Sequence, residues 1–342
     1  MKKNIFDYTV DELTEIYMRE FNQKKYRAVQ TYKWVYQENA EDFYKMSDLP
    51  LEFRKNLTEA FEMNSLTKET VRLSNDGTTK FLFRLKDGAA VETVLMKYNF
   101  GNSVCVSSQV GCRMKCDFCA SSKLSFERNL TSGEIVEQIV AASRHIGEKI
   151  SNVVFMGIGE PFDNYDNVMR AIRILNEPHG LNIGIRHITV STSGLVPQIM
   201  KFADSGLAAN LSISLHATTN EVRDKLMPVN KAYNVETLIQ ACKKYIEKTN
   251  RRITFEYALM YGVNDTIRDA CRLADLLNGM LCHVNLIPIN AIEGGSYSRT
   301  SQSVMMNFRD ALNNRGVTAT IRRELGSEID AACGQLRRQY FE

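Results

Sequence analysis

The sequence predicts an α/β protein, in which a partial (β/α) barrel carries a small helical accessory domain at its N-terminus. Two patterns along the chain predict this fold. From about residue 101 onward, candidate strands alternate with candidate helices, which is typical of a parallel sheet covered by helices. Within these strands polar residues alternate with apolar ones, so each strand has one hydrophilic face. Residues 1 to about 65 contain short amphipathic helices instead.

The N-terminal part of the chain predicts three helices followed by a β-hairpin. The helices are expected over Val10 to Phe21, Arg27 to Tyr36 and Leu51 to Phe61. The hairpin is expected from strands at residues 80–85 and 90–97, because the turn Lys86-Asp87-Gly88 lies between them. We therefore expect an accessory domain over residues 1–97 and a barrel over residues 98–342.

The remainder of the chain supplies the strands and helices of the barrel. The expected strands lie near residues 103–109, 152–157, 186–192, 208–216, 252–260, 281–287 and 317–323. The clearest helical segments between them cover residues 133–146, 234–248 and 301–314. Because connections that pass through a helix join parallel strands, this order predicts a parallel sheet.

The alternation within the strands predicts an open barrel with a polar interior. Near residue 210, one face presents Asn210, Ser212, Ser214 and His216, and the opposite face presents leucine and isoleucine. A closed eight-stranded barrel fills its interior with branched apolar side chains, so here the apolar face must contact the surrounding helices. The polar concave face is stable only if water or a polar ligand satisfies it. A partial barrel that holds a polar cofactor fits this pattern.

The overall composition is that of an ordinary globular protein. The chain has 342 residues, of which 44% are hydrophobic and 24% charged, and its net charge is +3. We expect a soluble, cytoplasmic protein without a membrane partner, because no signal peptide and no run of about 18 apolar residues is found. The eight cysteines lack the spacing of a small secreted scaffold and favour a reducing compartment. Basic doublets such as Arg251-Arg252 leave a nucleic-acid partner open, since helix surfaces often carry such pairs.

Three cysteines, Cys112, Cys116 and Cys119, form a C-x3-C-x2-C pattern on one predicted loop. Three thiolates leave one iron of a [4Fe–4S] cluster open to an outside ligand. S-adenosylmethionine (SAM) fills that position with its amino and carboxylate groups, and the spacing is similar to the radical SAM signature. A structural zinc site is the alternative, with nearby Cys105 as a fourth ligand, although its usual spacing fits less well.

A second motif follows the strand near residue 155. The segment Gly157-Ile158-Gly159-Glu160-Pro161 brings glycines to the end of a strand, where the backbone can approach a ligand closely. In a radical SAM barrel this position holds the methionyl amino group. The polar strand ends Ser191, Ser214, His216 and Asn285 are then expected to line the rest of the cofactor.

Further motifs extend over most of the chain, from about Tyr26 to Arg337. The segments are Val91-Glu92-Thr93-Val94, Cys105-Val106-Ser107-Ser108-Gln109-Val110-Gly111-Cys112, Val190-Ser191-Thr192-Ser193-Gly194, Ser214-Leu215-His216-Ala217, Leu226-Met227-Pro228-Val229-Asn230, Gly262-Val263-Asn264-Asp265, Asn285-Leu286-Ile287-Pro288 and Ile329-Asp330-Ala331-Ala332-Cys333-Gly334-Gln335-Leu336. With these, the chain resembles the RlmN/Cfr family of radical SAM RNA methyltransferases, and the RlmN type more closely.

The resemblance implies a set of catalytic and cofactor-binding residues. Cys333, on a C-terminal loop, receives a methyl group from one SAM, and a second SAM is cleaved on the cluster held by the three motif cysteines. The resulting radical abstracts hydrogen from the S-methyl group, and the carbon radical adds to the adenine ring. Cys105 then removes the ring proton and forms a transient disulfide with Cys333. Glu92 is implied as a proton acceptor, and Gly159, Glu160, Ser214, Leu215 and His216 as part of the SAM site.

The resemblance also implies the partners of the enzyme. Its substrates are adenosines in the peptidyl-transferase region of 23S rRNA and beside the anticodon in tRNA, both methylated at C2. A flavodoxin-type protein is the implied electron donor. Within the N-terminal helices, Tyr26, Arg27, Gln30 and Trp34 are candidates for contacting RNA, although a lone Trp34 is also a normal core residue of a small bundle.

Three alternatives remain open from the residues themselves. A Cfr-type enzyme methylates C8 of the same rRNA base with the same cluster and cysteines, and only Pro161 favours the RlmN type here. A non-catalytic RNA-binding protein with structural zinc is the second. Without the resemblance, Cys105 and Cys333 are also compatible with buried structural positions, as are Cys242, Cys271 and Cys282, and Glu92 with a solvated charge.

Overall fold

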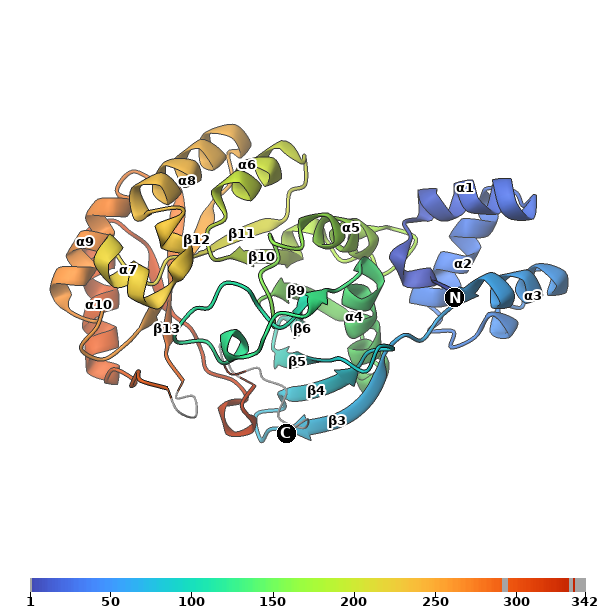
Figure 1. Ribbon diagram of the computed structural model, residues 1–342, viewed down its shortest axis with the longest axis horizontal. Helices are drawn as coiled ribbons and strands as arrows, with labels where there is room; N and C mark the ends of the chain where they lie inside the picture. The colour runs from blue at the N-terminus through green and yellow to red at the C-terminus, as the bar shows by residue number, and fades with distance from the viewer. Residues whose placement is uncertain (1, 291–294, 332–334, 336–342) are drawn as a thin grey trace.

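The computed structural model describes residues 2–290, 295–331 and 335 and arranges them as a helical N-terminal unit beside a curved sheet covered by helices (Figure 1). Cys333 lies outside the described residues. The sheet has ten strands and forms a barrel that is not closed, because its two edge strands are β14 and β3. This confirms the predicted fold class. No helix of the described chain is both long enough and apolar enough to cross a lipid bilayer.

The N-terminal unit consists of α1 (Val10–Phe21), α2 (Tyr26–Tyr36) and α3 (Leu51–Ala60), as the sequence predicts. A capping box between Thr9 and Glu12 starts α1. Two short strands, β1 (Lys3–Asn4) and β2 (Phe61–Glu62), pair and close the unit. Its core is aromatic, and the rings of Tyr17 and Phe53 meet edge to face at 5.0 Å.

The ten-stranded sheet combines a parallel part with an antiparallel part. All pairs from β6 to β14 are parallel, and β5, β4 and β3 extend the sheet with antiparallel pairs. The strands, in their spatial order, are β14 (Ala319–Ile321), β13 (Cys282–Pro288), β12 (Ile253–Leu259), β11 (Asn210–Ser214), β10 (Ile188–Thr192), β9 (Ile150–Phe155), β6 (Gly101–Cys105), β5 (Ala90–Tyr98), β4 (Thr79–Arg84) and β3 (Thr67–Leu73).

The expected hairpin is formed by β4 and β5, and it belongs to the same sheet as the barrel strands. Because β5 also pairs with β6, the sheet is continuous across residues 97 and 98, where a domain boundary is expected. Sequence patterns do not predict β3. It is an edge strand with mostly exposed and half-buried side chains, so it lacks the apolar alternation that marks buried strands.

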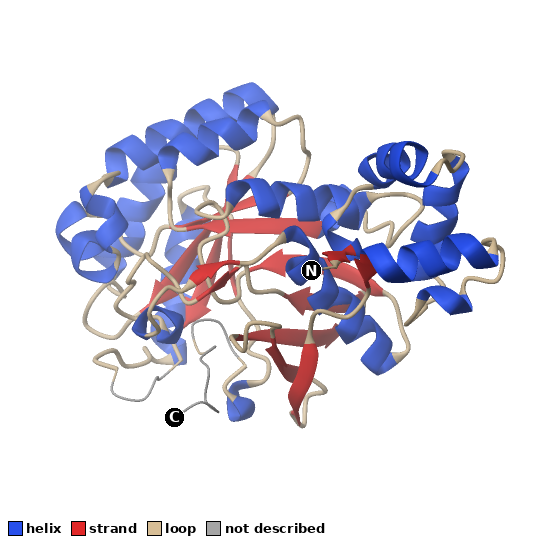
Figure 2. Cartoon of the chain, turned by 45° about the vertical axis from the view of Figure 1, so that its right-hand side comes forward, coloured by secondary structure: helices blue, strands red, loops and turns tan. Residues whose placement is uncertain are grey.

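Helices cover the outer face of the sheet (Figure 2). The apolar strand residues, among them Val190, Ile213 and Phe255, are fully buried in one large core cluster with these helices. Burial of such side chains contributes about 1.5–3 kcal/mol each. The covering helices are α4 (Ser132–Ile146), α5 (Tyr165–Asn176), α6 (Val196–Asp204), α7 (Asn220–Leu226), α8 (Val235–Thr249), α9 (Ile267–Leu277) and α10 (Gln302–Asn314).

Helix α4 joins the N-terminal unit to the barrel through buried polar contacts. The Asp7 carboxylate accepts the backbone N–H of Gly133 at 2.6 Å, at the start of α4. Along the same helix, the buried Glu137 carboxylate accepts the backbone N–H groups of Ser65 and Leu66 at 2.7 and 3.1 Å. These contacts fix the segment that leads from the N-terminal unit into β3.

We predict that Glu137→Ala lowers the free energy of unfolding by about 1–3 kcal/mol, because two buried N–H donors lose their acceptor. Urea unfolding followed by circular dichroism measures the change. Glu221→Ala, in an exposed i,i+4 pair with Lys225, is the matched control and should change stability by less than about 0.5 kcal/mol. Equal stabilities of the two variants would show that this joint does not depend on Glu137.

Candidate functional site

The three motif cysteines lie together on a loop at one end of the barrel. Cys112, Cys116 and Cys119 line a single cavity of about 170 Å³ at the C-terminal ends of β9, β10 and β11. The loop is held by its own backbone: the Cys119 N–H donates to the Cys116 carbonyl at 3.1 Å, and the Asp117 N–H donates to the Leu226 carbonyl at 3.0 Å. The three cysteines thus share one loop, as the sequence predicts, and the structure places them around one cavity.

Burial dominates the chemistry of two of these thiols. It raises the pKa of Cys112 to about 12 and the pKa of Cys116 well above its usual range. The thiols are therefore protonated until a cation replaces the protons, which is the usual coupling of metal binding to deprotonation. Such a site gains its negative charge only together with its metal.

The donor set fits an iron–sulfur cluster better than a single zinc ion. Among the described residues, no group of three or more His, Cys, Asp or Glu side chains is arranged to hold one metal ion. Around a tetrahedral zinc ion, the ligand sulfur atoms lie about 3.8 Å from one another, because the Zn–S bonds are about 2.3 Å long. In a cubane each thiolate binds a different iron, so the sulfurs stay further apart. Cys105, the possible fourth zinc ligand, lines a different cavity.

The Gly-Glu loop after β9 forms the floor of the same cavity. Gly159 has φ of +107°, and a Cβ there would lie 2.6 Å from the Cβ of Gln109, so only glycine fits. The buried Glu160 carboxylate accepts the N–H groups of Phe162 and Ser193 at 3.0 and 2.7 Å. Burial raises the pKa of Glu160, and these hydrogen bonds oppose the shift. The side chain thus ties two cavity loops together.

Five of the seven expected cofactor residues line this cavity, namely Gly159, Glu160, Ser191, Ser214 and His216. The other two do not. Leu215 is fully buried in the apolar core that faces the helices. Asn285 lines a second, larger cavity and donates its side-chain N–H to Glu256 at 2.8 Å.

His216 is held as a neutral ring at the edge of the cavity. Its Nδ1 accepts the Ala258 N–H at 2.9 Å, so a neutral ring carries its proton on Nε2. The ring centroid lies 4.8 Å from that of Phe118, on the cysteine loop, in an edge-on contact. Burial, with a smaller effect of Arg223, lowers the pKa of His216 to about 3.

Arg223 is a site residue that the sequence pattern did not reveal. It is fully buried, and it donates to the carbonyl oxygens of Ser193, Ser214 and Leu215 at 2.7, 3.1 and 3.0 Å. It therefore fixes the loops that follow β10 and β11, which carry the cavity residues. The sequence around it, Asn220-Glu221-Val222-Arg223, has the polar pattern of an exposed helix. The one signal that could have indicated a site residue is that Arg223 lies close to the Leu226-Met227-Pro228 motif.

Cys105 lines a third, small cavity of about 40 Å³, which adjoins the cavity of the motif cysteines. It is buried at the end of β6, and it packs in one apolar cluster with Val94, Leu325 and Ala331. Ala331 is the last described residue before the gap that contains Cys333. The chain that leads to Cys333 therefore reaches the cavity of Cys105.

Glu92 is buried and ion-paired in this structure. The residue lies two positions before Val94 on β5, and Val94 is the register partner of Cys105. Its carboxylate is 2.8 Å from Nζ of Lys80, which is also buried. Lys80 Nζ donates in addition to the carbonyl of Asp330 at 3.2 Å. A buried carboxylate requires such a partner, and this one links β5 to the C-terminal segment.

The turn between β3 and β4 holds the C-terminal segment in place (Figure 1). The Glu328 carboxylate accepts the backbone N–H of Asn75 at 2.6 Å and the Ser74 hydroxyl at 2.8 Å. The Gly326 N–H donates to Asp76 at 2.9 Å. These contacts lower the pKa of Glu328, mainly through the Asn75 N–H. The turn thus positions the residues just before Cys333.

Comparison with known proteins finds two family models on this chain. Residues 106–274 match the radical SAM superfamily, and residues 3–63 match the ribosomal RNA large subunit methyltransferase N-terminal domain. The second match covers the three-helix unit. The first starts one residue after Cys105 and includes the cysteine loop and strands β9 to β12.

Full-length relatives have closely similar sequences. A probable dual-specificity RNA methyltransferase RlmN from Geobacillus kaustophilus is 52% identical over 98% of this chain and 92% of its own length. One from Thermoanaerobacter sp. is 51% identical over 99% of both chains. The crystal structure of a radical SAM methyltransferase from Sphaerobacter thermophilus superposes with a TM-score of 0.94, at 45% identity over 98% of this chain and 99% of that one.

We predict that His216 contributes to a loss of stability as the pH is lowered. Below about pH 6.5 the unfolded chain binds a proton on this residue that the folded protein excludes, so the unfolding free energy falls towards pH 3. His216→Asn keeps an acceptor for the Ala258 N–H and tolerates the φ of +55°. Its stability, measured by urea unfolding between about pH 7 and pH 5, should fall less steeply.

The matched control is His179→Asn, which replaces an exposed histidine. Its pH dependence should follow that of the unsubstituted protein. An equally steep loss of stability in His216→Asn would mean that His216 takes up its proton in the folded state as readily as in the unfolded chain.

Proposed function

The chain belongs to the RlmN family of radical SAM RNA methyltransferases, and we propose that it methylates C2 of adenosine in both 23S rRNA and tRNA. The proposed targets are the adenosine in the peptidyl-transferase region and the adenosine beside the anticodon. One observation supports this most strongly. The cavity of the three motif cysteines and the cavity of Cys105 adjoin, since both are lined by Met156, Pro288 and Arg322.

The chemistry of the target requires more than ordinary methyl transfer. Adenine C2 lies between two ring nitrogens and is electron-poor, so it does not attack the methyl group of SAM as a nucleophile. Cys112, Cys116 and Cys119 would hold a [4Fe–4S] cluster, which together with SAM would supply the radical chemistry that methylation of such a carbon needs. The family implies this cofactor pair, and we propose that two SAM molecules are used per turnover.

Two cysteines of the chain are proposed to carry out the remaining steps of methyl transfer. We assign Cys333 as the acceptor of the first methyl group, and Cys105 as the base that removes the ring proton. The ring radical of the adduct also loses one electron, for which the oxidised cluster would be the acceptor. The Cys105 thiolate then attacks the sulfur of Cys333, so the S–S bond forms as the bond between that sulfur and the methylene carbon breaks. The methylene carbon takes a proton and becomes the methyl group of the released base. Val94, Leu325 and Ala331 pack with Cys105 in one apolar group, and we propose that these apolar surroundings keep water from the reacting thiols. A flavodoxin-type protein is the proposed source of electrons.

Glu92 is the proposed proton acceptor, and Lys80 is its positioning partner. The ion pair at 2.8 Å favours the ionised carboxylate, which is the form that accepts a proton. The same lysine holds the Asp330 carbonyl, three residues before Cys333. Movement of the C-terminal segment would therefore change the surroundings of the Glu92 carboxylate.

We propose that RNA is bound by the helical N-terminal unit, the part of the expected 1–97 domain that lies outside the ten-stranded sheet. Tyr26 is half exposed at the start of α2, and the Arg27 guanidinium lies 4.9 Å from the centre of its ring. Trp34 instead packs partly buried against the core and donates to Asp48. Tyr26 is thus better placed than Trp34 to stack on an unpaired base. A loop adenosine suits such an enzyme, because flipping it out costs only a few kcal/mol.

We predict 2-methyladenosine in both RNAs after anaerobic incubation of cluster-loaded protein with SAM, a reductant and unmodified 23S rRNA or tRNA. Mass spectrometry of the digested RNA measures the product. The protein itself should be brown and contain about four irons per chain. Formation of 8-methyladenosine would indicate Cfr-type chemistry, and colourless protein with about one zinc per chain would indicate a structural metal site.

A second prediction concerns the two catalytic cysteines. Cys105→Ala should accumulate a covalent protein–RNA species that migrates slowly in denaturing gels, since nothing resolves the adduct. Cys333→Ala should form neither adduct nor methylated base. Cys271→Ala, on α9 outside both cavities, is the control and should methylate RNA at the normal rate. Clean turnover by Cys105→Ala or by Cys333→Ala would remove the role assigned to that residue.

A further inference from the structure

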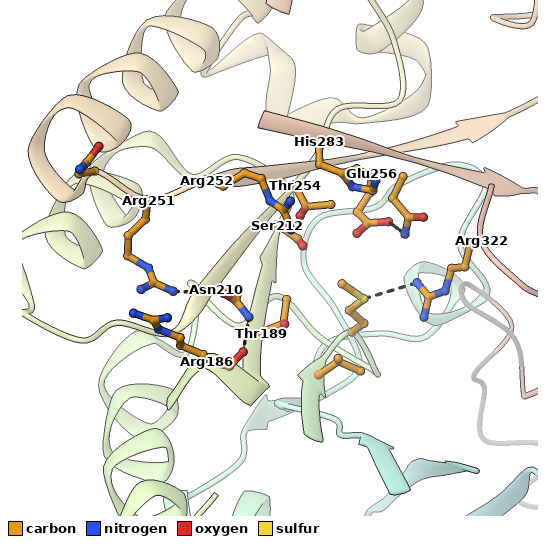
Figure 3. Close-up of a pocket in the computed structure, with 14 residues that line it drawn as sticks. Arg186, Thr189, Asn210, Ser212, Arg251, Arg252, Thr254, Glu256, His283 and Arg322 are labelled. Carbon is orange, nitrogen blue, oxygen red and sulfur yellow. Dashed lines mark hydrogen bonds between the residues drawn. The ribbon is translucent and has the colours of Figure 1, made fainter. Parts of the chain in front are cut away.

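The larger cavity that Asn285 lines extends towards the N-terminal ends of the barrel strands, and Figure 3 shows the side chains around it. Its volume is about 630 Å³, and its walls are mainly polar. Arg186 comes just before β10, Asn210 begins β11, and Arg251 and Arg252 come just before β12. Because these strands are parallel, their N-terminal ends meet at one edge of the sheet. The fold thus gathers residues that are far apart in sequence around one opening.

The charge of this cavity is strongly positive. Arg186, Arg251, Arg252 and Arg322 line it, and of the described residues in its wall only the buried Glu256 is acidic. Among the described residues, no carboxylate forms an ion pair with Arg186, Arg251 or Arg252. Arg251 hydrogen-bonds the neutral Asn210 at 3.1 Å. Guanidinium groups arranged in this way suit phosphate oxygens.

An exposed aromatic side chain lies beside this cavity. A neighbouring cavity of about 240 Å³ shares Arg186, Asn210 and Arg322 with it and is also lined by Tyr98 and Phe100. Phe100 is at the tip of the β5–β6 hairpin and is 72% exposed. Its ring stacks on Tyr98 with centroids 4.7 Å apart and planes 12° from parallel. A phenylalanine so exposed adds little to the core and offers a flat apolar face to a ligand.

We propose that these two cavities together, here called the basic groove, bind the unpaired RNA segment beside the target adenosine. Phe100 stacks on one base, and Arg186, Arg251 and Arg252 pair with phosphates. Basic grooves with aromatic stacking platforms are the usual way of binding single-stranded nucleic acid. The inference rests on the proposed function, because it takes the RNA substrate from it.

The position of the basic groove relative to the cofactor cavity supports this assignment. Met156, Glu256 and Arg322 line both the larger groove cavity and the cavity of the motif cysteines. Arg322 and Tyr98 also line the cavity of Cys105. An RNA segment in the groove therefore lies next to the space in which the flipped base must meet the two catalytic cysteines. A free inorganic anion would use the arginines but not the aromatic platform.

The test is RNA binding by the cluster-loaded protein. The probe is a fluorescent RNA hairpin with the target adenosine in its loop, and fluorescence anisotropy is measured at about 50 and about 200 mM salt. Phe100→Ala should bind the RNA hairpin about 5- to 100-fold more weakly than the unsubstituted protein. Phe100→Trp, which keeps an aromatic ring, should bind it with the unsubstituted affinity. The double variant Arg186→Gln with Arg252→Gln should reduce the slope of log affinity against log salt by about 1.4. Iron content and thermal midpoint show that each variant is folded.

Two control variants replace side chains of α10, outside the groove. Met306→Ala removes an exposed apolar side chain, and Arg309→Gln removes a partly buried arginine that pairs with Asp310. Both should bind RNA like the unsubstituted protein. Binding by Phe100→Ala and by the arginine variant at the unsubstituted affinity would overturn the inference. So would arginine-dependent binding of inorganic phosphate with RNA affinity unchanged, which would mark a small-anion site.

Methylation measured in parallel separates this inference from the proposed function. If the unsubstituted protein binds the hairpin but yields no methyladenosine, the proposed function is wrong. The affinities of the groove variants still decide whether the basic groove binds RNA. If methylation proceeds and none of the groove variants raises the KM for RNA, the groove assignment alone is wrong.

Discussion

The fold depends on one constraint: the concave face of the sheet is polar, and its polar side chains need hydrogen-bond partners. In the outer core, Val190, Ile213 and Phe255 pack against helices, and this burial stabilises the barrel. The inward positions then carry serine, threonine, asparagine and arginine. Such groups are stable in an interior only when ligands or water satisfy them. The two ends of the lumen meet this constraint differently, with a cysteine-lined cavity at the C-terminal ends of the strands and an arginine-lined cavity at the N-terminal ends.

Buried polar residues position the loops of this interior. Arg223 donates to carbonyls of the loops after β10 and β11, and Glu160 accepts N–H groups from two loops around the motif cysteines. In the antiparallel part of the sheet, Lys80 pairs with Glu92 and donates to the backbone carbonyl of Asp330, three residues before Cys333. Buried charged groups are costly unless every hydrogen bond is made, so these networks favour a single arrangement of the loops. The proposed radical chemistry needs a single arrangement of the loops, because a reactive radical abstracts hydrogen from any group that lies close to it.

Much of this architecture follows from the sequence, and the exceptions have physical reasons. Alternating polarity predicted the open barrel, and the cysteine spacing predicted that Cys112, Cys116 and Cys119 lie on one loop. Periodicity did not reveal that Arg223 is buried, because a charged residue on a short helix reads as exposed. It also did not separate Asn285 from Ser214, since polar strand residues point into one lumen but towards different ends of it. The basic groove was missed because Arg186 and Arg252 become neighbours only when parallel strands align. The expected position of Cys333 lies outside the described residues.

The central claim is that the methyl group reaches adenine through a carbon radical on Cys333 and not by direct displacement. Incubation with SAM that carries a fully deuterated methyl group tests this most directly, with mass spectrometry of the methyladenosine and of the deoxyadenosine formed. Abstraction of one deuterium predicts a product methyl group with two deuteriums, and one deuterium in deoxyadenosine. Retention of all three deuteriums in the methyladenosine, with none in deoxyadenosine, would contradict the account.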